Sequence, residues 1–273
     1  MRARHEQPCD LNHLPPAIAM DELEREAHVW LASPETIGDS RLLRRFRNSL
    51  SDEESSRMRR LKIAHHRHSY LVAHGLLRHT LSRYVDIAPE DWKFSHGRHG
   101  RPEIANPSAP PLRFNLTHTE GLTGCIVTLH ADCGIDAEQL TTRHATSDIA
   151  RRMFSEEECR ELERLPAREH TAYFFEHWTL REAYVKAIGT GISFPTNRLR
   201  FVTGHGGVAR VLFQPDIDDH GDDWQFRLLR PTDEHVAAVA VRKDGNGSRR
   251  ILTRFLDPEK PGTFLPEENG VYR

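Results

Sequence analysis

The sequence predicts an α+β protein rather than one in which strands and helices alternate regularly. Strand-like runs gather before and after a central helical section instead of alternating with helices one by one. The chain has 273 residues, which is enough for one large domain or two small ones. Two apolar runs, residues 121–129 and 235–241, loosely echo each other, although this similarity alone does not establish a repeat.

Short apolar runs between turn residues indicate the strands. We expect strands at residues 27–32, 114–117, 123–129, 133–138, 199–203, 208–213, 224–229 and 236–242. Gly and Pro are frequent in residues 97–111, which we therefore expect to form loops. Residues 1–20 contain prolines and lack periodicity, and the chain after Lys243 turns to Gly, Pro and charge. We expect both ends to be tails, residues 1–20 loose and residues 244–273 on the surface.

Three helical stretches have recognisable ends. Three acidic residues follow Ser51, which favours a helix start there, and apolar residues recur from there through a long stretch to Leu81. Ser155 and Glu158 form a capping-box pattern before a helix at residues 156–165. A further helix at residues 170–188 should end at Gly189, because glycine commonly ends helices.

Composition excludes several classes of protein. The formal net charge of −2 argues against bulk binding to nucleic acid or to an anionic membrane. No apolar run approaches the ~20 residues that span a bilayer, and we find no signal peptide, so we expect a cytoplasmic protein. The four cysteines show no Cys-x-x-Cys spacing, and the 18 histidines include no His-Glu-x-x-His pattern. We therefore expect reduced thiols and no zinc site.

Two carboxylate-bearing segments carry the strongest chemical signal. In a strand at residues 133–138, Asp136 and Glu138 are two apart and point to the same side. On the helix at residues 170–188, Glu182 and Lys186 are four apart and share a surface. Three carboxylates beside a lysine suit Mg²⁺ and a phosphate chain. The alternatives are the solvated face of an edge strand and an ordinary helix-surface ion pair, the latter worth about 0.2–0.5 kcal/mol.

Four segments in a fixed order resemble the motifs of one enzyme family. They are Gly97–Pro102, Phe114–Thr119, Gly134–Glu138, and Trp178–Lys186 followed by Gly189–Ile192. Together they resemble the 4′-phosphopantetheinyl transferases of the surfactin-synthetase-activating (Sfp) type. Thr117 stands where that family usually has serine, and Arg101 and Arg181 stand where it usually has lysine, which turns a compact charge into a planar fork.

The resemblance implies a fold and an activity. The fold would be two similar subdomains, residues 1–131 and 132–273, related by a pseudo-two-fold axis with the active site in the cleft between them. The activity would be transfer of the phosphopantetheine arm of coenzyme A to a serine of an apo carrier protein, with release of adenosine 3′,5′-bisphosphate. Family members of this length usually act as monomers. Carrier domains of polyketide, nonribosomal peptide or fatty-acid synthases would be the partners.

The resemblance also implies roles for particular residues. Asp136, Glu138 and Glu182 would hold Mg²⁺, and Lys186 would stabilise phosphate charge. Glu182 would also be positioned to accept the serine proton, directly or through a metal-bound water, although the sequence does not decide which group is the base. Coenzyme A would contact Thr117, His118 and Arg181 as well as Lys186, with Arg101 near the nucleotide. The helical stretch from Ser51 to Arg78 resembles the basic helix that helps bind the 3′-phosphate. Arg57 matches a basic position there, whereas Glu54 and Ser69 replace basic residues.

Two other functions fit the same carboxylates. One is a metal-dependent phosphohydrolase that acts on a nucleotide pyrophosphate and uses water instead of serine. The other is a non-catalytic module that binds coenzyme A or a carrier protein. The intact set of three carboxylates and Lys186 disfavours the binding module. Arginine-rich residues 41–47 or 57–67 are candidates for meeting an acidic carrier protein. They would equally suit a solvated helix face or a coenzyme phosphate.

Overall fold

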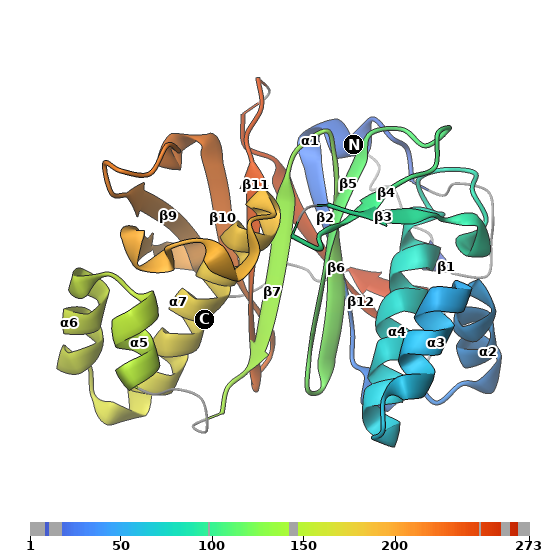
Figure 1. Ribbon diagram of the computed structural model, residues 1–273, viewed down its shortest axis with the longest axis horizontal. Helices are drawn as coiled ribbons and strands as arrows, with labels where there is room; N and C mark the ends of the chain where they lie inside the picture. The colour runs from blue at the N-terminus through green and yellow to red at the C-terminus, as the bar shows by residue number, and fades with distance from the viewer. Residues whose placement is uncertain are drawn as a thin grey trace, which may run out of the picture.

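The protein consists of two halves of strands and helices, which confirms the α+β class (Figure 1). The computed structural model describes residues 9–10, 18–97, 99–141, 147–245, 247–257 and 263–266. The first half contains α1 (Glu22–Arg25), β2 (Glu26–Ala32), α2 (Ser40–Ser49), α3 (Asp52–Arg60), α4 (Ala64–Leu81), β3 (Phe94–His96), β4 (Pro102–Ile104), β5 (Leu112–Thr119) and β6 (Leu122–Leu129).

The second half repeats this order of a strand, helices and more strands. It contains β7 (Cys133–Gln139), α5 (Ser147–Met153), α6 (Glu156–Arg164), α7 (Ala167–Ile188), β8 (Leu199–Thr203), β9 (Val208–Phe213), β10 (Trp224–Thr232) and β11 (His235–Arg242). Three further strands come from the two ends of the chain: β1 (Cys9–Asp10), β12 (Arg250–Leu256) and β13 (Thr263–Pro266).

The strands form two large sheets with matching central pairings. One sheet has the order β1-β13-β12-β2-β6-β5 and the other β7-β11-β10-β9-β8. In the first, β6 pairs antiparallel with both β2 and β5, and in the second β11 pairs antiparallel with both β7 and β10. The apolar runs that echo each other in the sequence are therefore β6 and β11, which occupy corresponding places in the two sheets.

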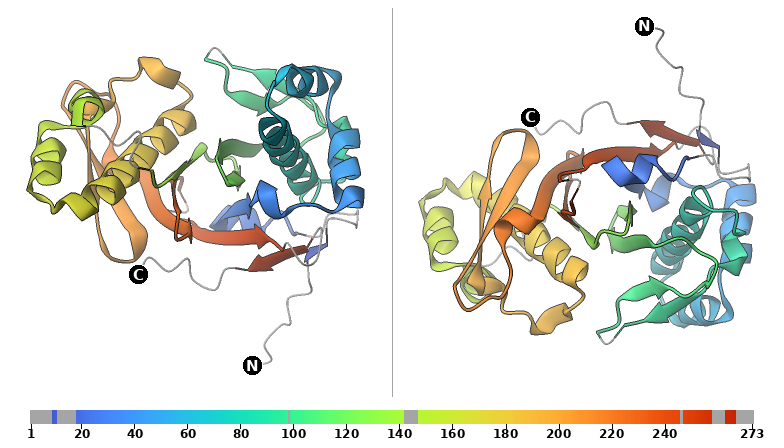
Figure 2. Two further views of the ribbon diagram at one scale, coloured as in Figure 1. Left: turned by 90° about the horizontal axis from the view of Figure 1, so that it is seen from below. Right: turned by 90° about the horizontal axis from the view of Figure 1, so that it is seen from above.

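The two sheets pack between two sets of helices (Figure 2). One apolar cluster lies between the first sheet and α2 and α4, and a second lies between the second sheet and helices α5 to α7. A third cluster, which includes Val29, Ile126, Ile135 and Val239, joins the two sheets face to face. Strands β6 and β11 are consequently buried on both faces, which explains their uninterrupted apolar sequences.

Three local predictions were wrong. The chain after Lys243 is not simply a surface tail, because β12 pairs in parallel with β2 and Leu256 is buried in the first apolar cluster. The expected continuous helix from Ser51 to Leu81 breaks between α3 and α4, where residues 61–63 are not helical. Residues 97–111 are not all loops, because Pro102–Ile104 forms β4 and pairs with β3. In addition, helix α2 was not predicted. Its Asp39 cap accepts hydrogen bonds from the amides of Arg41 and Leu42, at 3.0 and 2.7 Å.

The expected subdomain boundary falls between β6 and β7, which belong to different sheets. Residues 132–273 nevertheless do not form one separate unit, because β12 and β13 return to the first sheet. Of the expected loose tail at residues 1–20, Cys9 and Asp10 form β1, which pairs with β13, and residues 18–20 are described as well. The remainder of that tail lies outside the described residues. None of the described helices is long and apolar enough to cross a membrane.

Candidate active site

Strand β7 lies directly against helix α7, which brings its two carboxylates onto the helix. Gly134 makes this approach possible, because a Cβ atom at this position would lie only 2.0 Å from the carbonyl oxygen of Ala183. Side chains two residues apart share a face of a strand, so Asp136 and Glu138 point toward α7 as Gly134 does. The sequence-based prediction that both carboxylates share one face agrees with this packing.

Helix α7 places three residues, each four apart in the chain, opposite the carboxylates of β7. Trp178, Glu182 and Lys186 lie on one side of the helix, one turn from each other. The Lys186 ammonium group donates hydrogen bonds across to β7, to the Asp136 carboxylate at 2.6 Å and to the Ile135 carbonyl at 3.1 Å. Lys186 therefore joins the helix to the strand rather than forming only an ion pair along the helix surface.

The three carboxylates disturb one another's titration. Burial raises the pKa of Glu138 to about 7, and the negative charge of Asp136 adds to the effect. Burial raises the pKa of Asp136, and burial followed by the charge of Asp136 raises the pKa of Glu182. Moreover, the second carboxylate oxygen of Asp136 is buried without a hydrogen-bond partner among the described residues. A further positive charge would stabilise the ionised form of these buried carboxylates, so the donor set fits a hard divalent cation.

The carboxylate oxygens are not gathered around a single point. Among the described residues, only Glu22, Glu26 and His28 bring three potential ligand atoms within 4.8 Å of one another. Two of its members already have partners: His28 contacts Glu26 at 2.8 Å through Nε2 and the Tyr84 hydroxyl at 2.9 Å through Nδ1, and Glu26 also pairs with Arg250. Glu22 is exposed.

Strand β5 forms the other wall beside β7. Thr117 is 2% exposed, and its hydroxyl oxygen accepts a hydrogen bond from the Ala137 amide at 3.0 Å. Its neighbour His118 reaches the surface on the opposite face of the strand. Partial burial lowers the pKa of His118, and the positive charge of Lys186 lowers it further, which places these two side chains in one electrostatic environment. Strand β5 therefore presents His118 at the surface and turns Thr117 toward β7.

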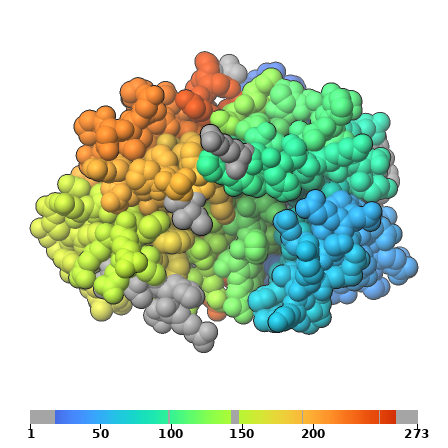
Figure 3. All heavy atoms as spheres, viewed as in Figure 1, coloured from blue at the N-terminus to red at the C-terminus, as the bar shows by residue number. Residues whose placement is uncertain are grey.

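The first half contains a pocket of about 470 Å³ between α3, α4 and the β3–β4 hairpin. Its lining includes Glu54, Arg57, Tyr70 and His74, with Gly100 on the opposite side. Arg57 is exposed there and forms an ion pair with Glu53 at 3.6 Å. Figure 3 shows that the molecular surface is hollowed between the two halves, with residues of the green middle section on its floor.

Arg101 bridges the two halves. Its guanidinium group donates to the Ala187 carbonyl in the last turn of α7 and lies 3.5 Å from the Asp132 carboxylate. Its side chain also covers Gly189, where a Cβ atom would lie 3.2 Å from the Arg101 Cδ atom. Gly189 ends α7 with a φ of 70°, a conformation that favours glycine. The Nε and Nη2 atoms of Arg101 are buried without partners among the described residues.

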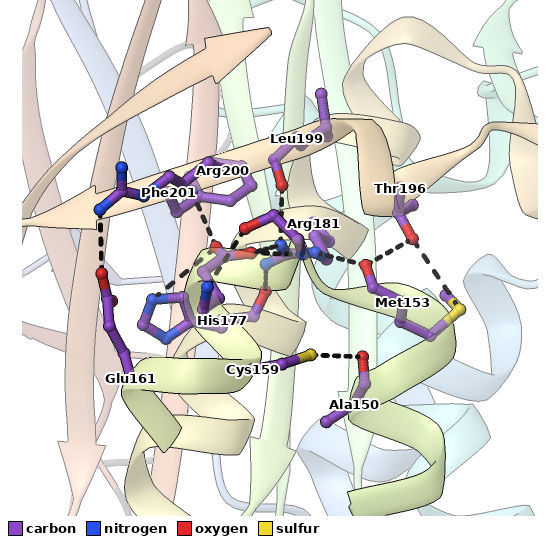
Figure 4. Close-up of polar contacts among 12 residues, drawn as sticks. Ala150, Met153, Cys159, Glu161, His177, Arg181, Thr196, Leu199, Arg200 and Phe201 are labelled. Carbon is purple, nitrogen blue, oxygen red and sulfur yellow. Dashed lines mark hydrogen bonds and ion pairs between the residues drawn. The ribbon is translucent and has the colours of Figure 1, made fainter. Parts of the chain in front are cut away.

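The prediction that Arg181 contacts coenzyme A was wrong. Its side chain is 1% exposed, and it forms an ion pair with the fully buried Glu158. Its remaining donors reach the carbonyl groups of Met153, His177 and Leu199 at 2.8–2.9 Å (Figure 4). Arg181 precedes Glu182 in the chain, but adjacent helix residues point in different directions, so Glu182 faces β7 while Arg181 faces α6.

Sequence reasoning missed or underrated three residues of the site. Asn115 lies beside Thr117 on one face of β5, and its side-chain oxygen accepts a hydrogen bond from the Ile135 amide at 3.0 Å. Trp178 donates a hydrogen bond to Glu138, which opposes the rise of the Glu138 pKa. Tyr70 lines the first-half pocket, and its hydroxyl group lacks a partner among the described residues. Strand alternation could have identified Asn115, since it lies two residues before Thr117.

Comparison with known proteins identifies the family. Residues 132–240 match the model of the 4′-phosphopantetheinyl transferase superfamily. The chain is 32% identical over 231 residues to the 4′-phosphopantetheinyl transferase HetI of Nostoc sp., covering 83% of this chain and 91% of HetI. It is 28% identical to a phosphopantetheinyl transferase of Thraustochytrium sp., covering 83% and 82% of the two chains. It is also 31% identical to Sfp of Bacillus subtilis, covering 55% and 65%. The chain therefore belongs to the 4′-phosphopantetheinyl transferase superfamily.

Proposed function

We propose that this chain performs the activity of its family with Mg²⁺ in the cleft between the two halves, at the carboxylates of β7 and α7. That activity transfers the phosphopantetheine arm of coenzyme A to a serine of a carrier protein and releases adenosine 3′,5′-bisphosphate. The observation that carries the assignment of the cleft is the Asp136–Lys186 pair. It joins strand to helix beside Glu138 and Glu182, and one buried oxygen of Asp136 is left without a partner.

Asp136, Glu138 and Glu182 would hold the ion. The raised pKa values of all three carboxyl groups support this assignment, because each would gain from a nearby positive charge. When bound, Mg²⁺ supplies Lewis-acid stabilisation of the charge on the pyrophosphate. A direct test is Mg²⁺ or Mn²⁺ binding measured by calorimetry, without carrier protein. We expect Asp136→Asn to weaken binding at least tenfold, and unchanged binding would remove Asp136 from the ligand set.

The chain's own groups perform the remaining steps. Lys186 provides a fixed positive charge toward the phosphate, and its two hydrogen bonds to β7 hold that charge in place before the substrate arrives. Glu182 is suited to accept the proton of the attacking serine, since burial raises the pKa of its carboxyl group toward neutrality. His118 and the free nitrogen atoms of Arg101 would contact the phosphates of coenzyme A, while Arg57 would act at the first-half pocket.

Mass spectrometry of an apo carrier protein tests this function. The carrier is incubated with this protein, coenzyme A and Mg²⁺, and we expect its mass to rise by one phosphopantetheine group. Release of adenosine bisphosphate without carrier protein would indicate the phosphohydrolase instead. Coenzyme A binding without release or transfer would indicate the non-catalytic module. Omitting Mg²⁺ in a parallel reaction separates the metal requirement from the activity.

We also propose that the acceptors are carrier domains of polyketide and nonribosomal peptide synthases, in the cytoplasm, and that the protein acts as a monomer. Exposed arginines on α2 and α3 support an acidic partner, because opposite charge speeds encounter. Transfer should therefore slow as salt rises. One peptidyl, one polyketide and one fatty-acid carrier are compared in parallel. Activity confined to the fatty-acid carrier would contradict the proposed acceptor class. Light scattering of the purified protein tests the monomer.

A further inference from the structure

The two large sheets meet at β5 and β7, although these strands share no backbone ladder. Each strand is the edge of its own sheet. Two side chains of β5 take the place of the missing ladder: Asn115 Oδ1 accepts from the Ile135 amide, and Thr117 Oγ1 accepts from the Ala137 amide, both at 3.0 Å. Both side chains are buried, with 5% and 2% of their residues' surface exposed. The two sheet edges are thus joined by hydrogen bonds from backbone amides of β7 to side chains of β5, a contact that we call the joint.

The two amides held by β5 flank Asp136 in the chain. Amides two residues apart on a strand point to the same side, so both of them face β5 while Asp136 lies between them. Lys186 reaches the same short segment through the Ile135 carbonyl and the Asp136 carboxylate. Residues 135–137 are therefore held on three sides, by the backbone ladder with β11, by the side chains of β5 and by Lys186 of α7.

We infer that Asn115 and Thr117 are positioning residues for the transfer reaction. They act by fixing residues 135–137 of β7, and with them the Asp136 carboxylate, where Lys186 can reach it. This role differs from the expected contact of Thr117 with coenzyme A phosphates. The Thr117 hydroxyl is buried against Ala137, whereas His118, on the opposite face of β5, is the residue presented to the cleft.

Loss of either acceptor should affect chemistry more than binding. A buried amide without an acceptor carries a desolvation penalty, so residues 135–137 would shift or admit water to satisfy it. A shift of about 1 Å at a reacting group can reduce turnover by about 100-fold. Coenzyme A, in contrast, gains its affinity from contacts spread over the cleft and the first-half pocket, which this change leaves in place.

The main experiment compares Thr117→Val with Thr117→Ser. Valine keeps the shape and removes the acceptor, whereas serine keeps the hydroxyl oxygen. Turnover at saturating coenzyme A is measured with an apo carrier protein, and the coenzyme A dissociation constant is measured by calorimetry. We expect Thr117→Val and Asn115→Leu to lower kcat at least about tenfold while the dissociation constant stays within about twofold. Thr117→Ser, which keeps the acceptor oxygen, should retain most of the wild-type turnover.

Thr128 supplies the matched control. Its hydroxyl is also buried and donates to the Ala131 carbonyl at 2.7 Å, but this bond holds the turn between β6 and β7 and not residues 135–137. Thr128→Val should lower the melting temperature about as much as Thr117→Val, with kcat unchanged. An equal loss of kcat in both variants would reduce the effect to general destabilisation and overturn the inference.

Two results at Thr117 would also overturn it. One is unchanged kcat in Thr117→Val, and the other is a raised coenzyme A dissociation constant with normal kcat, which would make Thr117 a ligand contact.

Hydrogen exchange of the wild-type protein gives a second test that needs no variant. The Ile135 and Ala137 amides should be as protected as the Asp136 amide, and free exchange at either would contradict the joint. The kinetic comparison rests on the proposed transferase activity. If the wild-type protein shows no transfer, the proposed function is wrong, and the exchange measurement would still test whether β5 holds residues 135–137.

Discussion

The two halves of the molecule contain the same side-chain network in opposite surroundings. Each network joins the capping box of a nine-residue helix to a Tyr, a His and an Arg spaced four apart on the next long helix. In both, the Tyr and His rings stack, with centroids 4.0 Å apart in the first half and 3.9 Å in the second. The first network is Ser51, Glu54, Tyr70, His74 and Arg78, and the second is Ser155, Glu158, Tyr173, His177 and Arg181.

The second network is sealed. Strand β8 covers it: the Phe201 amide donates to Glu158 at 2.8 Å, and the Leu199 carbonyl accepts from Arg181 at 2.9 Å. The Tyr173 hydroxyl is also occupied, since it donates to Glu161 at 2.9 Å. Every polar group of this network therefore ends on protein, and its role is to fix α6, α7 and β8 relative to one another.

The first network is open on one side. Arg78 is buried like its counterpart and donates to the Pro89 and Trp92 carbonyls at 3.0 and 2.9 Å. Glu54, Tyr70 and His74, however, line the first-half pocket, and the Tyr70 hydroxyl lacks a partner in the described part of the chain. A covering strand, rather than the network's own residues, therefore decides whether the network is enclosed by protein or lines a pocket.

The largest effect on stability should come from the sealed network. Removing one partner of a buried ion pair costs about 3–5 kcal/mol, because the other charge is left buried alone. We expect Arg181→Ala to lose this much unfolding free energy, measured by urea denaturation. Arg160→Ala, in the exposed part of the same half, is the control and should lose less than about 0.5 kcal/mol. A stable Arg181→Ala protein with weakened coenzyme A binding would restore the ligand role that its burial contradicts.

Next in size is an effect on activity in the second half, where β7 places Asp136 and Glu138 opposite the long helix α7. Lys186→Ala should lower turnover at least about 100-fold, since it removes a preorganised charge from the cleft. Lys186 is 29% exposed, so the loss of stability should stay near 1 kcal/mol. Turnover and melting temperature are measured together, with Lys243→Ala as the control. Normal turnover in Lys186→Ala would leave Lys186 with only a structural role between α7 and β7.

A third prediction uses pH to test the open network. Burial opposes ionisation of Glu54, but hydrogen bonds from His74 and the Ser51 amide and the charge of Arg78 bring its pKa down to about 2. A carboxyl group with a pKa lowered from 4.5 stabilises the fold above that pH, and the stabilisation is lost as pH falls toward 2. At about 1.36 kcal/mol per unit this amounts to at most about 3 kcal/mol.

The measurement compares the wild type with Glu54→Gln. The wild type should be more stable at pH 7, and the difference in unfolding free energy should shrink steadily between pH 4.5 and pH 2. Tyr70→Phe is the control, because it removes only a hydroxyl without a described partner and should leave this pH dependence intact. A constant difference across that range would mean that Glu54 titrates normally.

Local patterns predicted eight of the strands, β2 and β5 to β11, and the carboxylate face, because each depends on a short period that the chain itself displays. Strand alternation put Asp136 and Glu138 together, and Ser155 with Glu158 marked the start of α6, where the capping box is present. The resemblance of four ordered motifs identified the family, which the comparisons confirm.

The errors share a physical origin, because each depended on contacts between distant residues. Arg181 and Lys186 lie on one helix, yet the first faces α6 and the second faces β7. Only the packing of β8 shows that Arg181 is buried. The charged composition after Lys243 likewise hid β12, whose place beside β2 depends on a partner about 220 residues earlier. The contact of Thr117 with coenzyme A was predicted from the motif alone. Its hydrogen bond with the Ala137 amide forms where the two sheets meet, which the sequence does not display.

The smallest effect offers the sharpest comparison, because the two halves supply matched arginines. Arg57 pairs with Glu53 at 3.6 Å, and Arg160 pairs with Glu156 at 3.5 Å, each four residues apart on an exposed helix face. Such pairs contribute about 0.3–0.5 kcal/mol, so alanine at either position should change unfolding free energy by no more than that. Only Arg57 lines the first-half pocket. We therefore expect Arg57→Ala to raise the KM for coenzyme A about three- to tenfold with kcat unchanged, and Arg160→Ala to leave both unchanged. Added salt should narrow the difference between the two variants, because a charge at the protein surface is screened. Equal KM values at low salt would mean that the open network does not face coenzyme A.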